Sequence, residues 1–400
     1  MSKKLALFPL LLVLYEIIVY LSNDMYVPAL PSIMHDLFTT SHLTQLSVTT
    51  CFLGAVSMQL VLGPLSDRYG RKPILFGGAI VFVISTLICA FAPHIMTLLV
   101  ARFFQGTAVC SISVAGYAAI HEMYETKQAI QTIATMNSIT VLAPAVGPLL
   151  GSLVLLFGNW RNIFELLAVL AIVVLICLFR KMPETHAHSQ RHPLKLRLVL
   201  TNYASLFCNI TFLRHTLIFC LLFSAMIAWI AAGPFLITLT YHQPPYVFGL
   251  AQVFVFGAFI AGAHIAGRLI HTISPHRIVH HGLIYACVGG ILSAILAYCF
   301  SFFLIGFVLS LMLFTHGAGR GFAVLSRQAI EASQQPMGTT MAVFSTIMSG
   351  FGVLGSAFIS GFYNGTLLSL AAFFAGVGII AYLLHQTDRT RTETCHDTAK

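Results

Sequence analysis

Long apolar stretches dominate the chain, and short polar breaks separate most of them. Each stretch is about 20 residues long, which is the length that an α-helix needs to cross the hydrocarbon core of a bilayer. Twelve such stretches are expected, at roughly 7–27, 44–64, 73–92, 95–117, 128–156, 162–180, 213–239, 246–270, 278–298, 301–325, 337–360 and 364–385. The pattern therefore predicts an all-α membrane protein with 12 transmembrane helices.

The one long polar break, residues 181–212, divides these spans into six and six. Its second part, LKLRLVLTNYASLF, is expected to form a short amphipathic helix on the membrane surface. The predicted domains are an N-terminal six-helix half at 1–180, a cytoplasmic linker at 181–212, a C-terminal six-helix half at 213–385 and a cytoplasmic tail at 386–400. This layout resembles the major facilitator superfamily, whose two halves are related by an axis along the membrane normal.

Composition agrees with this class, because 58% of the 400 residues are hydrophobic and only 8% are charged. The net charge of +9 could suggest nucleic-acid binding, but the positions of the charges argue against it. If the N-terminus is cytoplasmic, nearly all Lys and Arg residues fall at or near cytoplasmic ends of spans, with Arg161 and Arg102 as exceptions. This bias follows the positive-inside rule. It predicts that both termini are cytoplasmic and that nucleic acid is not a partner.

Two acidic residues interrupt the first span, within YEIIVYLSNDMYVPAL. On a helix, Glu16, Tyr20, Asn23 and Asp24 recur at i, i+4, i+7 and i+8 and form one polar stripe. Because a carboxylate at the centre of a membrane helix costs roughly 2.5–3.5 kcal/mol, we expect the stripe to face a central cavity. Two acids on one stripe predict a site that loads and releases protons. A buried structural pair is the alternative.

Arg102 lies within LLVARFFQGTAV, about seven residues into the fourth span and thus roughly 10 Å deep. A guanidinium stays charged, so it is expected to face a cavity or a partner. Asp24 lies at about the same depth, and the two residues are expected to pair when Asp24 is ionised. Arg102, Gln105 and Gly106 resemble the fourth-helix signature of the superfamily, in which the arginine is tied to proton coupling. A structural clamp to backbone carbonyls is the alternative.

The segment GPLSDRYGRKPIL, between the second and third spans, resembles the loop signature of major facilitators. Its glycines are expected to allow a tight turn between two helix ends. A carboxylate suits a helix N-terminus, so we hypothesise that Asp67 docks at the start of the eleventh span and latches the two halves in one state. The alternative is that the basic cluster only anchors the loop inside the cell. The candidate gating residues of this segment are Gly63, Asp67, Arg68, Gly70 and Arg71.

The fifth span contains VLAPAVGPLLG, in which the prolines and the glycines are each spaced four residues apart. Prolines kink a helix, and a face of small residues allows a neighbouring helix to pack closely. The segment resembles the fifth-helix signature that separates antiporters from symporters in the superfamily. Ordinary helix packing through GxxxG spacing is the alternative. The segment adds Pro144, Gly147, Pro148 and Gly151 to the gating candidates.

Further segments extend the resemblance over nearly the whole chain. LFPLLLVLYE, SNDM, GYAAIHE, APAVGPLLG, MPET, AWIAAGPFLI and GLAQVFVFGAFIAG resemble segments of the MdfA-type multidrug transporters, a group of DHA1 drug:proton antiporters near the Bcr/CflA group. This resemblance implies that Glu16 and Asp24 bind protons and cationic drug, and that Arg102 takes part in proton coupling. The candidates for the substrate site are Tyr20, Asn23, Asp24, Val109, Met136, Thr140, Met226, Ile227 and Phe256.

The expected function is proton-coupled efflux of lipophilic cationic, zwitterionic or neutral small molecules by alternating access, in the bacterial inner membrane. The expected partners are the small-molecule substrate, protons and the lipid bilayer, and the protein is expected to be a monomer. No cofactor and no metal are expected, because the proton gradient would drive transport.

Export of one endogenous metabolite, such as a siderophore, an amino acid or a polyamine, is the main alternative function. A proton-coupled importer is disfavoured by the fifth-helix signature. A membrane enzyme is disfavoured because the sequence contains no HExxH, GxSxG or DxD-type cluster.

Overall fold

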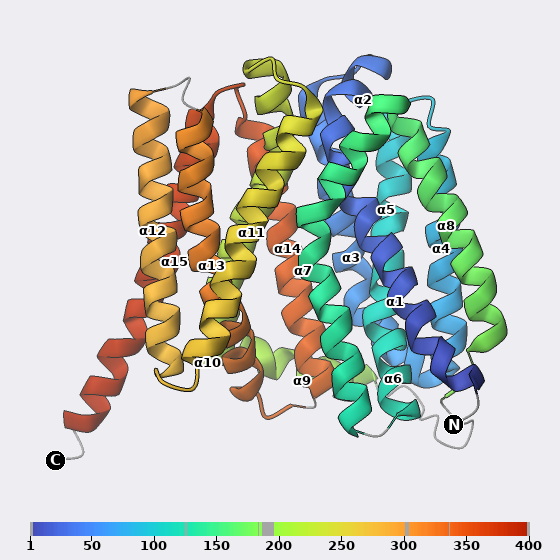
Figure 1. The fold of residues 1–400 in the computed structure, drawn as a ribbon. Helices are drawn as coiled ribbons and strands as arrows, with labels where there is room; N and C mark the ends of the chain where they lie inside the picture. Colours follow the sequence, from blue (N-terminus) through green and yellow to red (C-terminus); the bar gives the residue numbers. More distant parts are fainter. Residues whose placement is uncertain are drawn as a thin grey trace. The chain divides into compact units, whose positions relative to one another are not determined.

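The structure is a computed structural model, and it describes residues 3–124, 126–182, 184–185, 196–300, 304–335 and 337–397. Within these ranges, side chains are described except at 3–7, 121, 126–141, 196–199 and 388–397. The described chain is almost entirely helical (Figure 1). Packing divides the protein into two compact units, Met1–Val199 with Pro244–Leu250, and Leu200–Gln243 with Ala251–Lys400.

The first unit contains eight α-helices in its described part. They are α1 (Lys3–Asp24), α2 (Leu30–Asp36), α3 (Ser41–Tyr69), α4 (Arg71–Ala90), α5 (Ile95–Ser111), α6 (Tyr117–Met123), α7 (Thr126–Phe157) and α8 (Trp160–Lys181). A short 3₁₀ turn, Val27–Ala29, joins α1 to α2, and a π-helical turn, Ile112–Gly116, joins α5 to α6.

Most of the remaining helices belong to the second unit. They are α9 (Leu196–Phe207), α10 (Ile210–Phe235), α11 (Pro245–Leu269), α12 (Pro275–Cys299), α13 (Leu304–Glu331), α14 (Met337–Phe362) and α15 (Leu367–Asp397). The first turns of α9 and of α11 are assigned to the first unit. The amphipathic helix expected in the linker corresponds to α9.

Eleven helical stretches in the described part of the chain are long and apolar enough to cross a bilayer. They are Phe8–Asp36, Ser41–Tyr69, Arg71–Ala90, Ile95–Ile120, Trp160–Lys181, Ile210–Thr240, Pro245–Leu269, Pro275–Cys299, Leu304–Glu331, Met337–Phe362 and Leu367–Thr387. The remaining predicted span, 128–156, corresponds to α7, which has 32 residues and whose searched part, Leu142–Phe157, is apolar.

One predicted boundary is wrong. The helix α3 continues to Tyr69, so Gly63 lies inside a helix and not in a turn. The turn consists of Gly70 alone, whose φ of 104° lies in a region that glycine adopts without the steric penalty of a Cβ atom. The helix α15 extends from the last apolar span into the predicted tail, as far as Asp397.

In the first unit, α1 packs against α7 and α8, α3 packs against α5, and α4 packs against α5 and α8 (Figure 1). Small residues permit the closest of these contacts. A Cβ atom on Gly54 of α3 would overlap the carbonyl oxygen of Phe103, and one on Gly106 of α5 would overlap that of Cys51. This packing fixes the distance between α3 and α5.

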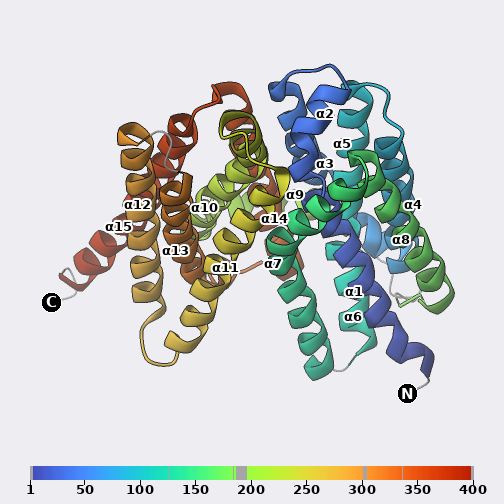
Figure 2. The same cartoon turned by 45° about the horizontal axis from the view of Figure 1, so that its top comes forward.

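In the second unit, α10 packs against α13, α14 and α15, and α12 packs against α13 and α15 (Figure 2). The indole nitrogen of Trp229 on α10 donates a 2.6 Å hydrogen bond to Gln252 on α11. Both side chains are fully buried, so this bond satisfies polar groups that would otherwise be costly to bury.

Candidate functional site

Arg102 is the centre of a buried polar network between α1 and α5. Its Nη1 donates to the amide oxygen of Gln105 at 2.7 Å and to the backbone oxygen of Ser22 at 3.2 Å. Its Nη2 donates to Asn23 Oδ1 at 2.8 Å, and its guanidinium carbon lies 4.2 Å from the ring centroid of Tyr26. The guanidinium is fully buried and therefore holds the end of α1 against α5 through several charge-assisted contacts.

The hydrogen bonds of Arg102 go to two kinds of acceptor. One contact is to a backbone carbonyl, as the clamp alternative expects, and two are to side-chain amides. Within the described residues, Arg102 and Asp24 form no ion pair, so the expected pairing is not present in this structure.

Gln105 completes this network through contacts that its place in the fourth-helix signature did not predict. Its Oε1 accepts from Arg102, and its Nε2 donates to the hydroxyl of Thr86 on α4 at 2.7 Å. Thr86 in turn donates to the backbone oxygen of Phe82 at 2.7 Å. The i, i+3 spacing of Arg102 and Gln105 could have indicated their contact, but nothing local in the sequence indicated Thr86.

Asp24 lies at the contact between α1 and α7. Its side chain is buried, and a Cβ atom on Gly147 would lie 2.6 Å from Asp24 Cβ. One turn further along α7, a Cβ atom on Gly151 would overlap the backbone oxygen of Met25. The glycines of the fifth-span segment thus form the surface on which the carboxyl end of α1 rests.

The two prolines of this segment lie within the same continuous helix. Pro144 and Pro148 are both inside α7, which extends without a break from Thr126 to Phe157. The hydroxyl of Ser152 donates to the carbonyl oxygen of Pro148 at 2.8 Å and to that of Pro245, at the start of α11, at 3.3 Å.

Glu16 occupies a different environment, two turns away from Asp24. It is 1% exposed, and its Oε1 accepts a 2.8 Å hydrogen bond from the hydroxyl of Tyr117 at the start of α6. Its Oε2 is buried and accepts no hydrogen bond within the described residues. The two carboxyl groups, separated by roughly 12 Å along the helix axis, therefore have different neighbours.

Tyr117 is a candidate site residue that the sequence analysis missed, although its segment, GYAAIHE, was noted for its resemblance. The π-helical turn Ile112–Gly116 directly precedes it. Such turns insert an extra residue into a helix and often occur at functional sites. In this protein, the turn precedes the phenol that contacts Glu16.

The other predicted substrate-site residues are placed as follows. Tyr20, Asn23 and Val109 are partly buried in the first unit, and Asn23 is held by Arg102. Met226 and Ile227 on α10 and Phe256 on α11 are buried in the second unit. The side chains of Met136 and Thr140 lie outside the described part of α7.

The segment GPLSDRYGRKPIL, at the junction of α3 and α4, takes part in a network of ion pairs and hydrogen bonds within the first unit. Arg71 Nη1 donates to Asp67 at 2.6 Å and to Ser66 at 3.0 Å, and Arg71 Nε donates to Glu122 at 3.0 Å. The Glu184 carboxylate accepts from the backbone nitrogens of Arg71 at 3.0 Å and of Lys72 at 3.3 Å, which places an anion at the N-terminus of α4.

Two further observations complete this network. The hydroxyl of Thr185 donates to the second oxygen of Glu122 at 2.6 Å. Arg68 is exposed, and its guanidinium carbon lies 5.3 Å from the ring centroid of Tyr69. Glu122 and Glu184 were not predicted as site residues, because they lie 51 and 113 residues from Arg71 in the sequence.

The chain is similar to named transporters over most of its length. It is 30% identical to the multidrug resistance protein MdtM of Escherichia coli O157:H7, over 98% of this chain and 96% of that protein. It is 31% identical to the multidrug transporter MdfA of Escherichia coli O6:H1, over 87% of this chain and 84% of that protein.

The fold is similar to that of solved transporters. The xylose transporter XylE from E. coli superposes with a TM-score of 0.72 at 14% identity, covering 96% of this chain and 98% of that one. This likeness confirms the predicted all-α fold of 12 transmembrane helices. Residues 12–357 match the description Major Facilitator Superfamily, and the chain therefore belongs to that superfamily, with an MdfA-like sequence.

Proposed function

We propose that this protein is a proton-coupled multidrug efflux transporter, a drug:proton antiporter that works by alternating access. The observation that carries the proposal is the pair of buried carboxyl groups, Glu16 and Asp24, in a chain whose relatives are named multidrug transporters. Neither carboxyl forms an ion pair within the described residues, so each is available to a proton or to a cationic substrate.

The exchange follows from charge balance. In the inward-facing state, a lipophilic cation that approaches Asp24 or Glu16 favours the ionised carboxylate, and the proton leaves to the cytoplasm. In the outward-facing state, a proton from outside neutralises the carboxylate and weakens its hold on the cation, which leaves. Arg102 lies close to Asn23 and Ser22 and biases this exchange electrostatically.

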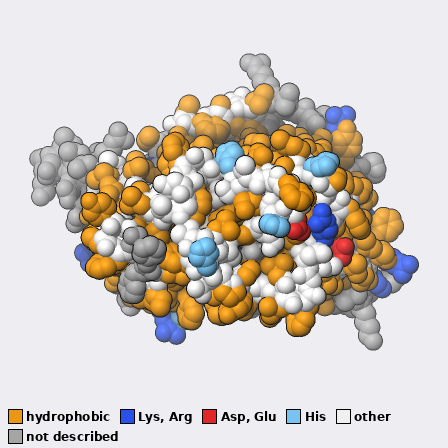
Figure 3. Space-filling model, turned by 90° about the horizontal axis from the view of Figure 1, so that it is seen from above, with side chains coloured by type: hydrophobic (Ala, Val, Ile, Leu, Met, Phe, Trp, Pro, Cys, Tyr) orange, Lys and Arg blue, Asp and Glu red, His pale blue; other side chains and the backbone are white. Residues whose placement is uncertain are grey.

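The orientation in the membrane is part of the proposal. The face in Figure 3, at the α2 end of the helices, shows few charged side chains among hydrophobic and neutral polar ones. The charged residues Asp67, Arg68, Arg71, Arg180 and Lys181 lie near helix ends that join α3 to α4 or follow α8. Following the positive-inside rule, we place these ends and both termini in the cytoplasm, in the inner membrane of a bacterium.

The transporter is proposed to act as a monomer and without a cofactor, with the proton gradient as its energy source. The names of the relatives favour multidrug export over export of one endogenous metabolite.

Substrate-induced proton release tests the function directly. Purified protein in detergent, weakly buffered at mildly alkaline pH, is mixed with tetraphenylphosphonium, ethidium and neutral antibiotics, and the released protons are measured. We expect release from the unmodified protein, and loss of that release in Glu16→Gln, in Asp24→Asn or in the double variant.

The matched control is Glu331→Gln, because Glu331 is an exposed carboxylate that pairs with Arg327 at the end of α13. Its removal is expected to leave the release unchanged. Release that persists in the folded double variant would overturn the proposed coupling. Absence of release with every compound, from folded unmodified protein, would favour the metabolite exporter.

A further inference from the structure

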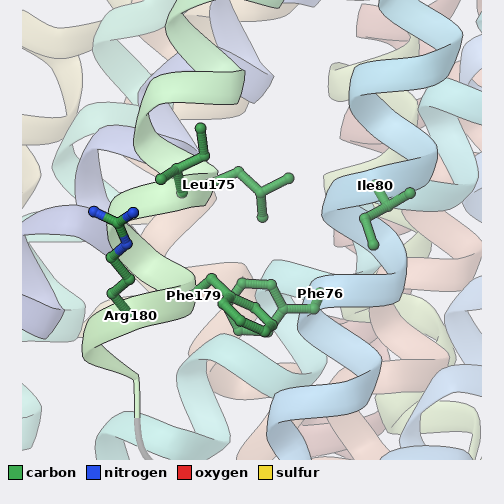
Figure 4. A pocket seen from close by; sticks show the side chains of 6 residues that line it. Phe76, Ile80, Leu175, Phe179 and Arg180 are labelled. Carbon is green, nitrogen blue, oxygen red and sulfur yellow. The ribbon is translucent and has the colours of Figure 1, made fainter.

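A groove lies between α4 and α8 on the first unit, away from the buried carboxyl groups. It has a volume of about 460 Å³ and is lined by Phe76 and Ile80 of α4 and by Leu175, Ile176, Phe179 and Arg180 of α8. Figure 4 shows the rings of Phe76 and Phe179 meeting between the two helices, with Ile80 and Leu175 above them. Apart from the arginine, the lining is entirely apolar.

The two aromatic rings lie at one end of the groove (Figure 4), and the ammonium group of Lys72 lies over both of them. They pack edge to face, with ring centroids 5.1 Å apart. The ammonium nitrogen of Lys72 lies 5.8 Å from the Phe76 centroid and 5.3 Å from the Phe179 centroid. A cation therefore lies directly at the end of an apolar groove.

The Lys72 ammonium has no carboxylate partner among the residues whose side chains the structure describes. Lys72 is in the first turn of α4, where the helix dipole disfavours a cation. The neighbouring Arg71 has the carboxylates of Asp67 and Glu122, whereas Glu184 binds backbone nitrogens.

Further cations lie at the same end of α8. Arg180 and Lys181 are in its last turn, where they also complement the helix dipole. Arg180 lines the groove, and Figure 4 shows its guanidinium on the side of α8 away from the Phe76 ring. This end of the groove therefore has a positive potential, and the Glu184 carboxylate beside it already accepts two hydrogen bonds from backbone nitrogens.

We propose that this groove binds an anionic phospholipid of the bilayer, with an acyl chain along the apolar lining and the phosphate at Lys72. Both α4 and α8 are long and apolar enough to cross a bilayer, and the lining residues Ile80, Ile176 and Phe179 are exposed, so this groove faces the lipid. Basic pockets between membrane helices bind anionic head groups, whereas a neutral lipid would leave Lys72 unbalanced. A soluble phosphate ester would leave the apolar lining uncovered.

Native mass spectrometry of the full-length protein tests this site. Delipidated protein in detergent is offered equal amounts of phosphatidylglycerol and phosphatidylethanolamine with the same acyl chains. We expect preferential retention of phosphatidylglycerol. In Lys72→Gln the preference should fall about fivefold, since one cation near the membrane surface is lost.

Two further experiments separate the contribution of the acyl chain to binding from that of the phosphate. Ile80→Trp fills the groove and should reduce retention of phosphatidylglycerol, and Leu175→Trp does the same from α8 if the first variant does not fold. Water-soluble glycerophosphoglycerol, which has no acyl chain, should not displace the lipid. Displacement by it would overturn the lipid assignment in favour of a phosphate site.

The matched control is Arg268→Gln, an exposed arginine in the last turn of α11 in the second unit. It should leave the lipid preference unchanged. Equal loss of preference in Lys72→Gln and Arg268→Gln, or no loss in either, would show adventitious annular lipid only and overturn the proposal.

Discussion

At the scale of single residues, the two acids of the polar stripe, Glu16 and Asp24, have different neighbours. Both carboxyl groups lie on α1 and are buried, but Glu16 accepts a hydrogen bond from Tyr117 and Asp24 lies against Gly147. A change at Tyr117 should therefore affect the Glu16 carboxyl and not the Asp24 carboxyl.

Tyr117→Phe removes the hydrogen bond to Glu16 while keeping the ring. A hydrogen bond to a charged group contributes about 1.5–3 kcal/mol, so we expect transport to fall about tenfold, with an altered pH profile. The measurement is drug-driven proton exchange in proteoliposomes as a function of pH. The control is Tyr15→Phe, because the buried Tyr15 hydroxyl has no hydrogen-bond partner in the described residues. Equal profiles for both variants would contradict a role for Tyr117 at Glu16.

Arg102→Lys replaces a planar guanidinium by a single ammonium that cannot reach Asn23, Gln105 and Ser22 together. Loss of one charge-assisted hydrogen bond should destabilise the protein by about 1.5–3 kcal/mol. Thermal unfolding in detergent checks this, with the partly exposed Arg161→Lys as control. If both variants unfold at the same temperature, the network around Arg102 does not stabilise the first unit.

At the scale of helices, the distance to which two backbones can approach determines which helix pairs pack tightly. Membrane helices gain little from burying apolar side chains against one another, because lipid is equally apolar, so small residues at contacts matter more. Gly147 and Gly151 allow α7 to approach the end of α1, and Gly54 and Gly106 do the same between α3 and α5.

Gly151→Ala should therefore destabilise the protein. The added methyl group would overlap the carbonyl oxygen of Met25, and overpacking of this kind costs about 1–3 kcal/mol. The control is Gly267→Ala on α11, where a Cβ atom would meet no atom within 4 Å. Thermal unfolding of the two variants should differ clearly; a stable Gly151→Ala protein would show that α1 and α7 can move apart without cost.

At the scale of the whole molecule, acidic residues are distributed unevenly. Of the 12 Asp and Glu residues, those after residue 200 are only Glu331, Asp388, Glu393 and Asp397. All of these lie at or beyond the ends of predicted spans. Proton coupling through carboxyl groups is therefore proposed for the first unit alone.

The proposed orientation predicts which ends of the helices face the outside. Phe38→Cys, at a 94% exposed position between α2 and α3, should react with an impermeant maleimide in intact cells. Gln334→Cys, between α13 and α14, should react only after permeabilisation. Both are made in a background without the nine native cysteines. The reverse pattern would invert the topology.

The docking of Asp67 at the eleventh span remains a prediction. Asp67→Asn should shift the balance of inward-facing and outward-facing states, measured by distance distributions between spin labels on the two units. Glu331→Gln is the control, because Glu331 is an exposed carboxylate that pairs with Arg327 at the end of α13 and is not a gating candidate. Equal distributions in both variants would favour the alternative, in which the loop only anchors the membrane end.

The sequence by itself determined the number and approximate limits of the membrane spans, because a span requires about 20 apolar residues whatever surrounds it. It also determined that Glu16, Asn23 and Asp24 share one helix face, because helical periodicity is local. The same reasoning misplaced Gly63, since glycine permits a turn but does not require one.

Only the tertiary structure decided the partners of these residues. Tyr117 is 101 residues from Glu16, and Asn23 is 79 residues from Arg102. No local pattern specifies such pairs, because they depend on which helices pack together and at what distance. The glycines of α3, α5 and α7 set those distances, and the buried polar groups then take the partners that the packing brings within reach.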